Sequence, residues 1–324
     1  KVDEWRSLAP PEKDALAGVE NISCPGPDEE AGIIALKLRE ALETPGKTAA
    51  LVTPDRRLAR RVAVELGRWD IEIDDSAGLP LSQTSPGSFL RLTAELVAHQ
   101  FLPINFLAVG KHPLAAGENM PVAFRQLVRD LEIAVLRGPR PAPGIEGLLD
   151  LVPENRPDLH EMLVAVQKMS APFNTAMTAP EISLSALLKS HIAFAEALAA
   201  TGEASGLARL WAGDAGEAAG SFVAELLEAS DVLGDITGTS YTALLEVLMT
   251  GRAVRPSYGS HPRLAIWGSL EARLQHADLI VLGGLNEGTW PPDIGSDPWM
   301  SRPMRKDFGL PAPERRIGLT AHDF

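Results

Sequence analysis

The sequence predicts an α/β protein in which a parallel-sheet domain is interrupted by an all-α segment. Three observations predict this class. Helix and strand patterns alternate over residues 28–101, helix-length apolar periodicity without strands fills residues 103–256, and strand patterns return after Pro262. We therefore expect residues 1–102 and 257–324 to form one sheet domain in two parts, with residues 103–256 as its helical insertion.

The first part of the sheet domain alternates helices with strands. Apolar residues in 28–43 fall mostly on one helical face, and residues 48–53 have the length and bounds of a buried strand. Residues 56–69 predict a second helix with basic residues on its outer face. A short strand at 71–73 and a helix over 85–101, opened by a Ser-Pro pair, complete this part.

The middle segment contains five candidate helices, at residues 121–136, 158–169, 183–200, 214–230 and 240–249. Residues 137–144 and 170–180 are expected to be loops between them. Residues 210–251 hold seven acidic residues and no lysine or arginine, so this surface should repel phosphate. Beyond the segment, residues 263–267 and 277–284 are expected to be two further strands of the sheet.

Composition excludes several classes of protein. The 324 residues are 45% hydrophobic, which excludes a disordered or fibrous chain. The net charge of −13 is unfavourable for a freestanding nucleic-acid-binding protein, so any contact with DNA must be confined to a local basic region. The single cysteine, Cys24, excludes an internal disulfide framework and a cysteine-rich metal site. It also indicates a reducing compartment, and we expect a cytoplasmic protein with no membrane partner.

The two ends of the chain indicate an internal segment of a longer polypeptide. The sequence opens at Lys1-Val2-Asp3 without an initiator methionine or a signal region. It stops at residues 321–324, on a pattern typical of an unfinished apolar helix.

The residues give no catalytic centre. Gly46-Lys47-Thr48 copies the end of a phosphate-binding loop, but Ala41 replaces the required glycine and the motif precedes a strand instead of following one. It is therefore interpreted as a helix-to-strand turn. No acidic residue is followed two positions later by lysine, and no zinc-protease or serine-hydrolase motif occurs. We expect no catalytic residue and no metal ligand in this chain.

Residues 279–291, LIVLGGLNEGTWP, resemble motif V of UvrD-type superfamily 1 helicases, with Asn286, Glu287 and Gly288 in its loop. Glu314 and the arginines after it resemble the start of motif VI. Residues 297–324, the KHPLAAG segment at 111–117 and the helix-strand-helix pattern of 28–66 are most similar to the AddB family, the second subunit of bacterial AddAB helicase–nucleases. These complexes process DNA double-strand breaks for recombination.

The resemblance implies that residues 1–102 and 257–324 form the RecA-like domain called 2A, with residues 103–256 as its 2B insertion. The sequence departs from active helicases at two motifs. The position of the motif VI arginine finger falls on Phe324, and Leu274-Gln275-His276 replaces the Gly-Leu-Glu of motif V. An inactive ATPase half without its own cofactor is thus implied. ATP, Mg²⁺ and the iron–sulfur cluster of the nuclease domain would belong to the parent complex.

The function implied is a scaffold for an AddA-type helicase–nuclease subunit in a heterodimer that acts on double- and single-stranded DNA. The segment would guide or read one DNA strand. Arginines near the motif-like segments are candidates for backbone contacts and two tryptophans for base stacking: Arg56, Arg57, Arg60, Arg61, Arg302, Arg305, Arg315, Arg316, Trp290 and Trp299. Each arginine has the alternative of a solvated helix face or a salt bridge, and each tryptophan that of a core residue.

Two other functions remain open from the sequence. The chain is alternatively half of an active ATP-dependent superfamily 1 helicase, against which the missing arginine finger argues. It is alternatively a freestanding helical module that docks a basic protein through residues 210–251. That hypothesis requires the flanking α/β segments to have no part in the function, and the order of their motifs argues against this.

Overall fold

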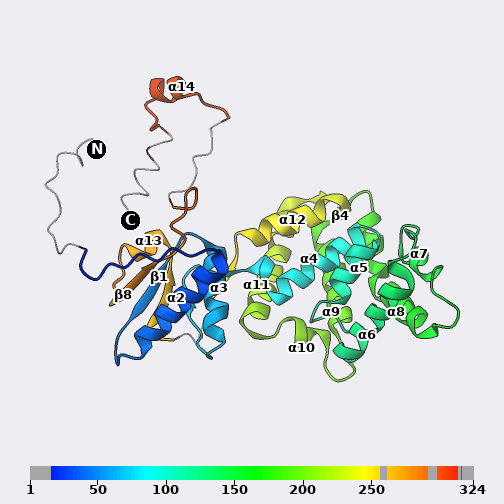
Figure 1. Cartoon of the computed structure of the whole chain (residues 1–324). Coiled ribbons are helices and arrows are strands. Elements are labelled where there is room, and N and C mark those ends of the chain that lie inside the picture. The colour runs from blue at the N-terminus through cyan, green and yellow to red at the C-terminus, as the bar shows by residue number, and fades with distance from the viewer. Residues whose placement is uncertain (1–15, 256–260, 291–297, 313–314, 316–324) are drawn as a thin grey trace. The chain divides into compact units, whose positions relative to one another are not determined.

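The computed structural model describes residues 16–255, 261–290, 298–312 and 315, and its contacts divide the chain into two compact units (Figure 1). The sheet unit comprises Lys1–Ala77 and Tyr258–Phe324, and the helical unit comprises Gly78–Ser257. The sheet unit is thus built from two separate stretches of sequence, and the helical unit from the stretch between them.

Four parallel strands form the sheet, in the order β2 (Asp74–Asp75), β7 (Leu264–Trp267), β1 (Ala49–Val52) and β8 (Leu279–Leu282). β1, from the first stretch of sequence, lies between two strands from the second. Leu51 pairs with Ile266 on one side and with Val281 on the other. The predicted α/β class with a parallel sheet is therefore confirmed.

Two helices pack on this sheet and on each other, α2 (Pro27–Leu42) and α3 (Arg56–Gly67). Alternate strand residues point to one face, because successive side chains of a strand alternate in direction. On this face Leu51 and Ile266 join the buried side chains of both helices in one apolar core. A four-residue helix, α13 (Ser269–Ala272), lies between β7 and β8 in the chain.

The Gly-Lys-Thr motif is a turn at the amino end of β1. Gly46 adopts a φ of +78°, which favours glycine. The Thr48 amide and hydroxyl both donate to the Asp278 carboxylate at 2.8 Å, and the Asp278 amide donates back to the Thr48 hydroxyl at 3.0 Å. These bonds lower the pKa of Asp278 and join the starts of β1 and β8. The turn interpretation is confirmed.

Replacing Asp278 with alanine is expected to loosen the amino end of the sheet, because the Thr48 amide and hydroxyl lose their shared acceptor. Hydrogen exchange should become faster at the backbone amides of β1 and β8. Glu43→Ala is the control, since Glu43 is an exposed carboxylate in the same unit without a side-chain hydrogen bond among the described residues. Equal exchange in the two variants would contradict the role given to Asp278.

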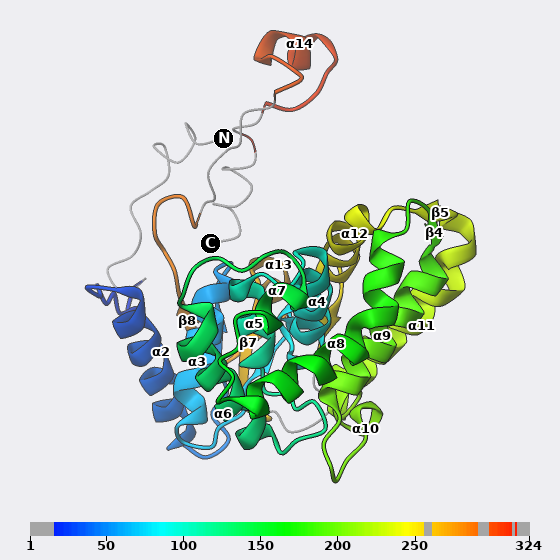
Figure 2. The ribbon, with the colours of Figure 1, turned by 90° about the vertical axis from the view of Figure 1, so that its right-hand side faces the viewer.

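The helical unit is assembled around α4 (Ser85–Ala98), which packs on α5, α8, α9, α11 and α12 (Figure 2). The other α-helices described in this unit are α5 (Pro103–Gly110), α6 (Pro121–Leu131), α7 (Ile145–Leu149), α8 (Pro157–Thr178), α9 (Leu184–Ala199), α10 (Gly206–Leu210), α11 (Gly213–Leu233) and α12 (Gly238–Thr250). Phe89, Phe173 and Phe194 are fully buried in the shared core.

The chain enters and leaves the helical unit side by side. β3 (Leu79–Pro80) pairs antiparallel with β6 (Ala253–Val254), and the Leu81 amide donates to the Arg252 carbonyl at 2.8 Å. A second two-residue pair joins β4 (Ile182–Ser183) and β5 (Asp235–Ile236). None of the helices in the described ranges is both long and apolar enough to cross a membrane.

Two sequence predictions about these elements differ from the structure. The contact division falls between Ala77 and Gly78 instead of after residue 102, because α4 packs on α5, α9 and α12. Residues 170–180 were expected as a loop, yet α8 continues through Pro172 to Thr178. Proline disfavours helix, but burial of Phe173, Ala176 and Met177 in the core stabilises this last turn.

The remaining differences concern short or irregular elements. The second strand pairs at Asp74–Asp75 instead of 71–73, because Ile71 and Ile73 pack on the core beside it. The helix expected over 121–136 changes at Glu132 into a π-helical turn that ends at Leu136. The five-residue helices α7 and α10 were not predicted, since each is too short to show a period.

Candidate nucleic-acid interface

Helix α3 carries the predicted basic side chains on an exposed face. Asp55 caps the helix, since its carboxylate accepts hydrogen bonds from the amides of Arg57 at 2.8 Å and Leu58 at 3.2 Å. The opposite face of α3 is buried in the core of the sheet unit through Leu58, Ala59, Val62 and Leu66. Burial of this apolar face fixes the direction in which the arginines project.

Two of the four α3 arginines are neutralised within the sheet unit. Arg56 forms an ion pair with Asp75 of β2, in which both side chains are partly buried. Arg61 lies 3.0 Å from Asp28 at the start of α2. The alternative of a salt bridge therefore holds for these two residues.

Arg57 and Arg60 remain as uncompensated charges on α3. Both are exposed, and neither forms an ion pair with a residue in the described part of the chain. They stand three positions apart, so their side chains are neighbours on the helix surface. Two adjacent exposed guanidinium groups suit two phosphates of a nucleic-acid backbone.

The carboxyl edge of the sheet is acidic, although open α/β sheets usually bind ligands there. The Glu30 carboxylate accepts a hydrogen bond from the Gly284 amide at 2.7 Å, and Asp55 occupies the free amides at the start of α3. The nearby guanidinium, Arg56, is already paired with Asp75. A nucleotide phosphate would thus meet two carboxylates, and the amides of Arg57 and Leu58 are already engaged.

The motif V-like loop follows β8 and closes in a turn. The carbonyl of Asn286 accepts hydrogen bonds from the amides of Thr289 and Trp290, both at 3.0 Å. Asn286 and Glu287 are exposed, and Gly288 has a φ of +78°. Trp290 is only 8% exposed, so its indole face is covered in this conformation, as the core alternative predicted.

The other candidates lie near the end of the chain. Trp299, a predicted stacking residue, is 87% exposed. Arg302 and Arg305 belong to α14 (Arg302–Asp307), where Arg305 Nε donates to the Pro311 carbonyl at 3.1 Å. Arg315 is exposed, whereas Glu314 and Arg316 lie outside the described residues.

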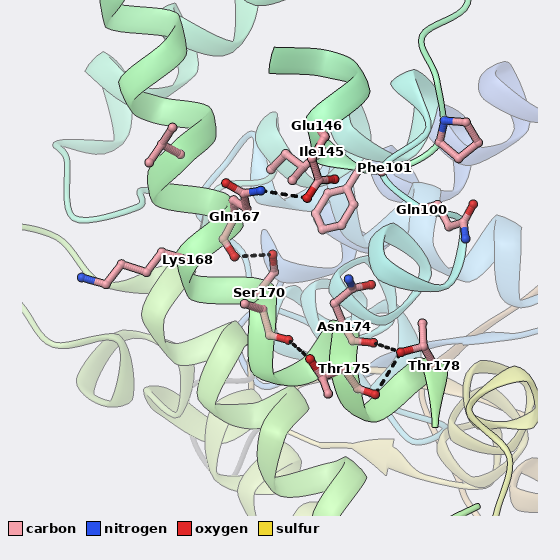
Figure 3. A pocket seen from close by; sticks show the side chains of 14 residues that line it. Gln100, Phe101, Ile145, Glu146, Gln167, Lys168, Ser170, Asn174, Thr175 and Thr178 are labelled. Carbon is pink, nitrogen blue, oxygen red and sulfur yellow. Dashed lines mark hydrogen bonds between the residues drawn. The ribbon is translucent and has the colours of Figure 1, made fainter. Parts of the chain in front are cut away.

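A groove of about 470 Å³ in the helical unit was not predicted from the sequence (Figure 3). It is lined by polar side chains of α8, by α7 and by the turn after α4, where Gln100 and Phe101 both adopt positive φ angles. Gln167 donates to Glu146 across it at 2.9 Å. Three distant stretches of sequence build this groove, so no local pattern could have revealed it.

No group of three or more metal-ligating side chains occurs among the residues that the structure describes. Comparison with known families and with curated proteins finds no family model and no protein that matches this chain.

Proposed function

We propose that this chain is an AddB-like segment of a helicase–nuclease that repairs DNA double-strand breaks in the cytoplasm. In this proposal the sheet unit is a RecA-like 2A domain and the helical unit is its 2B insertion. The supporting observation is the placement of β1 between β7 and β8, which come from the other side of the helical unit in the sequence. The pairing of β3 with β6 also brings both ends of that unit together.

The segment would bind single-stranded DNA and hold an AddA-type partner subunit. Arg57 and Arg60 supply the charge for backbone contacts, because Arg56 and Arg61 are engaged by carboxylates. Contacts of this kind position a strand without reading its bases. Trp299, which is largely exposed, is the candidate for base stacking in this proposal.

ATP hydrolysis would belong to the partner subunit, and Mg²⁺ with it. The Asp55 carboxylate accepts hydrogen bonds from the amides of Arg57 and Leu58, and the Arg56 charge is neutralised by Asp75, so the carboxyl edge offers little to a triphosphate. These contacts disfavour the alternative of an active helicase half. The iron–sulfur nuclease domain implied by the resemblance would lie elsewhere in the parent polypeptide.

The double substitution Arg57→Ala/Arg60→Ala is expected to weaken binding of a fluorescent oligo(dT) by about tenfold at low salt, because two phosphates lose their cations. Equilibrium anisotropy with the full chain measures the change. The matched control is Lys37→Ala/Arg68→Ala, which removes two cations already paired with Glu20 and Glu65 at 2.9 and 2.8 Å.

The control should change affinity by less than about twofold, since an exposed cation that is already paired contributes little to the field at the DNA. Equal effects of the two double variants would show that α3 makes no specific contact. ATP hydrolysis by the chain without its partner would instead favour the active-helicase alternative.

A further inference from the structure

Strand β8 lies at one edge of the four-stranded sheet, and β1 is its only neighbour among the described strands (Figure 1). The amides of Leu279 and Gly283 donate to carbonyls on the β1 side of the sheet, at 3.1 and 3.0 Å. Successive amides of a strand point to opposite edges, so the amides of Ile280 and Leu282 point away from β1. The outer edge of β8 is therefore a row of backbone donors and acceptors that face away from the sheet.

Nothing in the described part of the chain pairs with this outer edge. The amides and carbonyls of Ile280 and Leu282 form no hydrogen bond with any residue that the structure describes. The Ile280 side chain is 47% exposed, whereas Leu279 and Val281 pack against the core that the sheet shares with α2 and α3. The backbone groups of Ile280 and Leu282 are thus available to a further strand.

The two edges of the sheet differ in how they resist a further strand. The opposite edge is β2, which has two residues, both aspartates, and Asp75 is paired with Arg56. Short edge strands and charged side chains discourage pairing with another chain. β8 has four residues, Leu279–Leu282, without a charge or a proline, and two glycines follow it. The β8 edge therefore lacks the protection that the β2 edge has.

The backbone groups at this edge determine what can occupy it. A strand rises about 3.3 Å per residue, so its outward groups match those of an extended segment. A helix does not fit, because its backbone groups are bonded within the helix. β8 carries no charge for an ion pair, and Ile280 presents a branched apolar side chain to a neighbouring strand. Cross-strand pairing therefore favours an apolar, branched residue beside Ile280.

We propose that the outer edge of β8 binds an extended, apolar segment of a partner polypeptide, which adds a strand to the sheet. Hydrogen bonds to the backbone of Ile280 and Leu282 supply the affinity, and the side chain of Ile280 selects branched apolar residues in the added strand. This inference goes beyond the proposed function, because it does not depend on Arg57 or Arg60.

The probe is an acetylated peptide of alternating threonine and valine with a lysine at each end, added to the full chain. Its binding is expected to slow hydrogen exchange at the amides of Ile280 and Leu282 by about tenfold or more at saturation, because both amides become hydrogen-bonded. A second peptide with prolines at its two central positions should not bind, since it lacks a central donor on either edge. Unchanged exchange at both amides with the first peptide would overturn the inference.

Ile280→Pro removes one outward amide and leaves the hydrogen bonds from β8 to β1 in place, since proline is tolerated at an edge position whose amide faces away from the sheet. Affinity for the first peptide is expected to fall about tenfold. Ile280→Val keeps the amide and a branched side chain, so this matched control should stay within about twofold of wild type. Exchange at the Leu51 amide, in an interior strand, shows whether the sheet remains folded.

Ile280→Lys gives a second test that does not alter the backbone. A charge beside the added strand should also weaken peptide binding about tenfold. Wild-type affinity in Ile280→Lys and in a folded Ile280→Pro would overturn the inference. Light scattering shows whether the wild type dimerises without peptide. A dimer that is lost in Ile280→Pro would overturn the assignment to a different partner, because a second copy would then occupy the edge.

Discussion

Gly206→Ala is expected to lower the free energy of unfolding of the helical unit by about 3 kcal/mol. A Cβ atom at this position would lie 1.7 Å from the Glu196 carbonyl oxygen and 2.5 Å from its carbon. Both atoms are backbone, so no side-chain rotation relieves the overlap. α10 must therefore move away from the end of α9, and the buried contacts between these helices are lost.

Gly32→Ala in α2 is the matched control. No heavy atom lies within 4 Å of the Cβ that it adds, so alanine is expected to be neutral or to stabilise the helix by about 0.5–1 kcal/mol. Urea unfolding of the full chain measures both effects, with hydrogen exchange to assign the loss to α9 and α10. A Gly206→Ala protein as stable as wild type would show that the packing of α10 on α9 is wrong.

Acidification from pH 7 to pH 5 is expected to destabilise the helical unit by about 2 kcal/mol through His191 alone. His191 of α9 is fully buried, with Nε2 2.9 Å from the Thr93 hydroxyl and Nδ1 2.8 Å from the Tyr241 hydroxyl. Thr93 donates its proton to the backbone of α4. It therefore accepts from Nε2, and Nδ1 accepts from Tyr241, so the network is satisfied by neutral imidazole.

The sign follows from the two states of this imidazole. Burial lowers the pKa of His191 to about 3, whereas the unfolded chain keeps an ordinary pKa near 6.5. Between these values the unfolded state binds a proton that the folded state does not, so stability falls as pH decreases. Above about pH 6.5 the imidazole is neutral in both states, so the helical unit loses no stability through His191. His112, whose pKa burial lowers to about 4, adds to the loss in the same direction.

His191→Gln separates this contribution from the others. Glutamine does not titrate, so the change in unfolding free energy between pH 7 and pH 5 should be about 2 kcal/mol smaller than in wild type. The variant should also be less stable at pH 7, because it loses the stacking of Phe173 on the imidazole at 4.7 Å. If the unfolding free energies of wild type and His191→Gln depended on pH in the same way, a group other than His191 would bind the proton.

The sequence identified the elements whose own residues determine them. α3 follows from its apolar spacing and from Asp55 as its cap, and β1 from a short apolar run between turns. Elements that depend on distant partners were misplaced. β2 is defined by its pairing with β7, nearly two hundred residues away, and the last turn of α8 depends on a core that local pattern does not show.

The same division applies to the candidate interface. The sequence located four arginines on one helix, but only the fold shows which of them remain charged. Asp75 and Asp28, which engage Arg56 and Arg61, lie 19 and 33 positions from their partners, so spacing gave no signal of either pair. Trp290 is a stacking candidate from its residue type and its place in the motif V-like loop, yet it is covered in the folded chain.

In the proposed function, α3 holds single-stranded DNA by charge through Arg57 and Arg60. The most direct test is the salt dependence of oligo(dT) affinity for the wild type and for Arg57→Ala/Arg60→Ala. Log affinity is expected to decline linearly with log salt, with a slope shallower in the variant by about 1.4, because each single-strand phosphate contact contributes about 0.7. Identical slopes for the two proteins would contradict it.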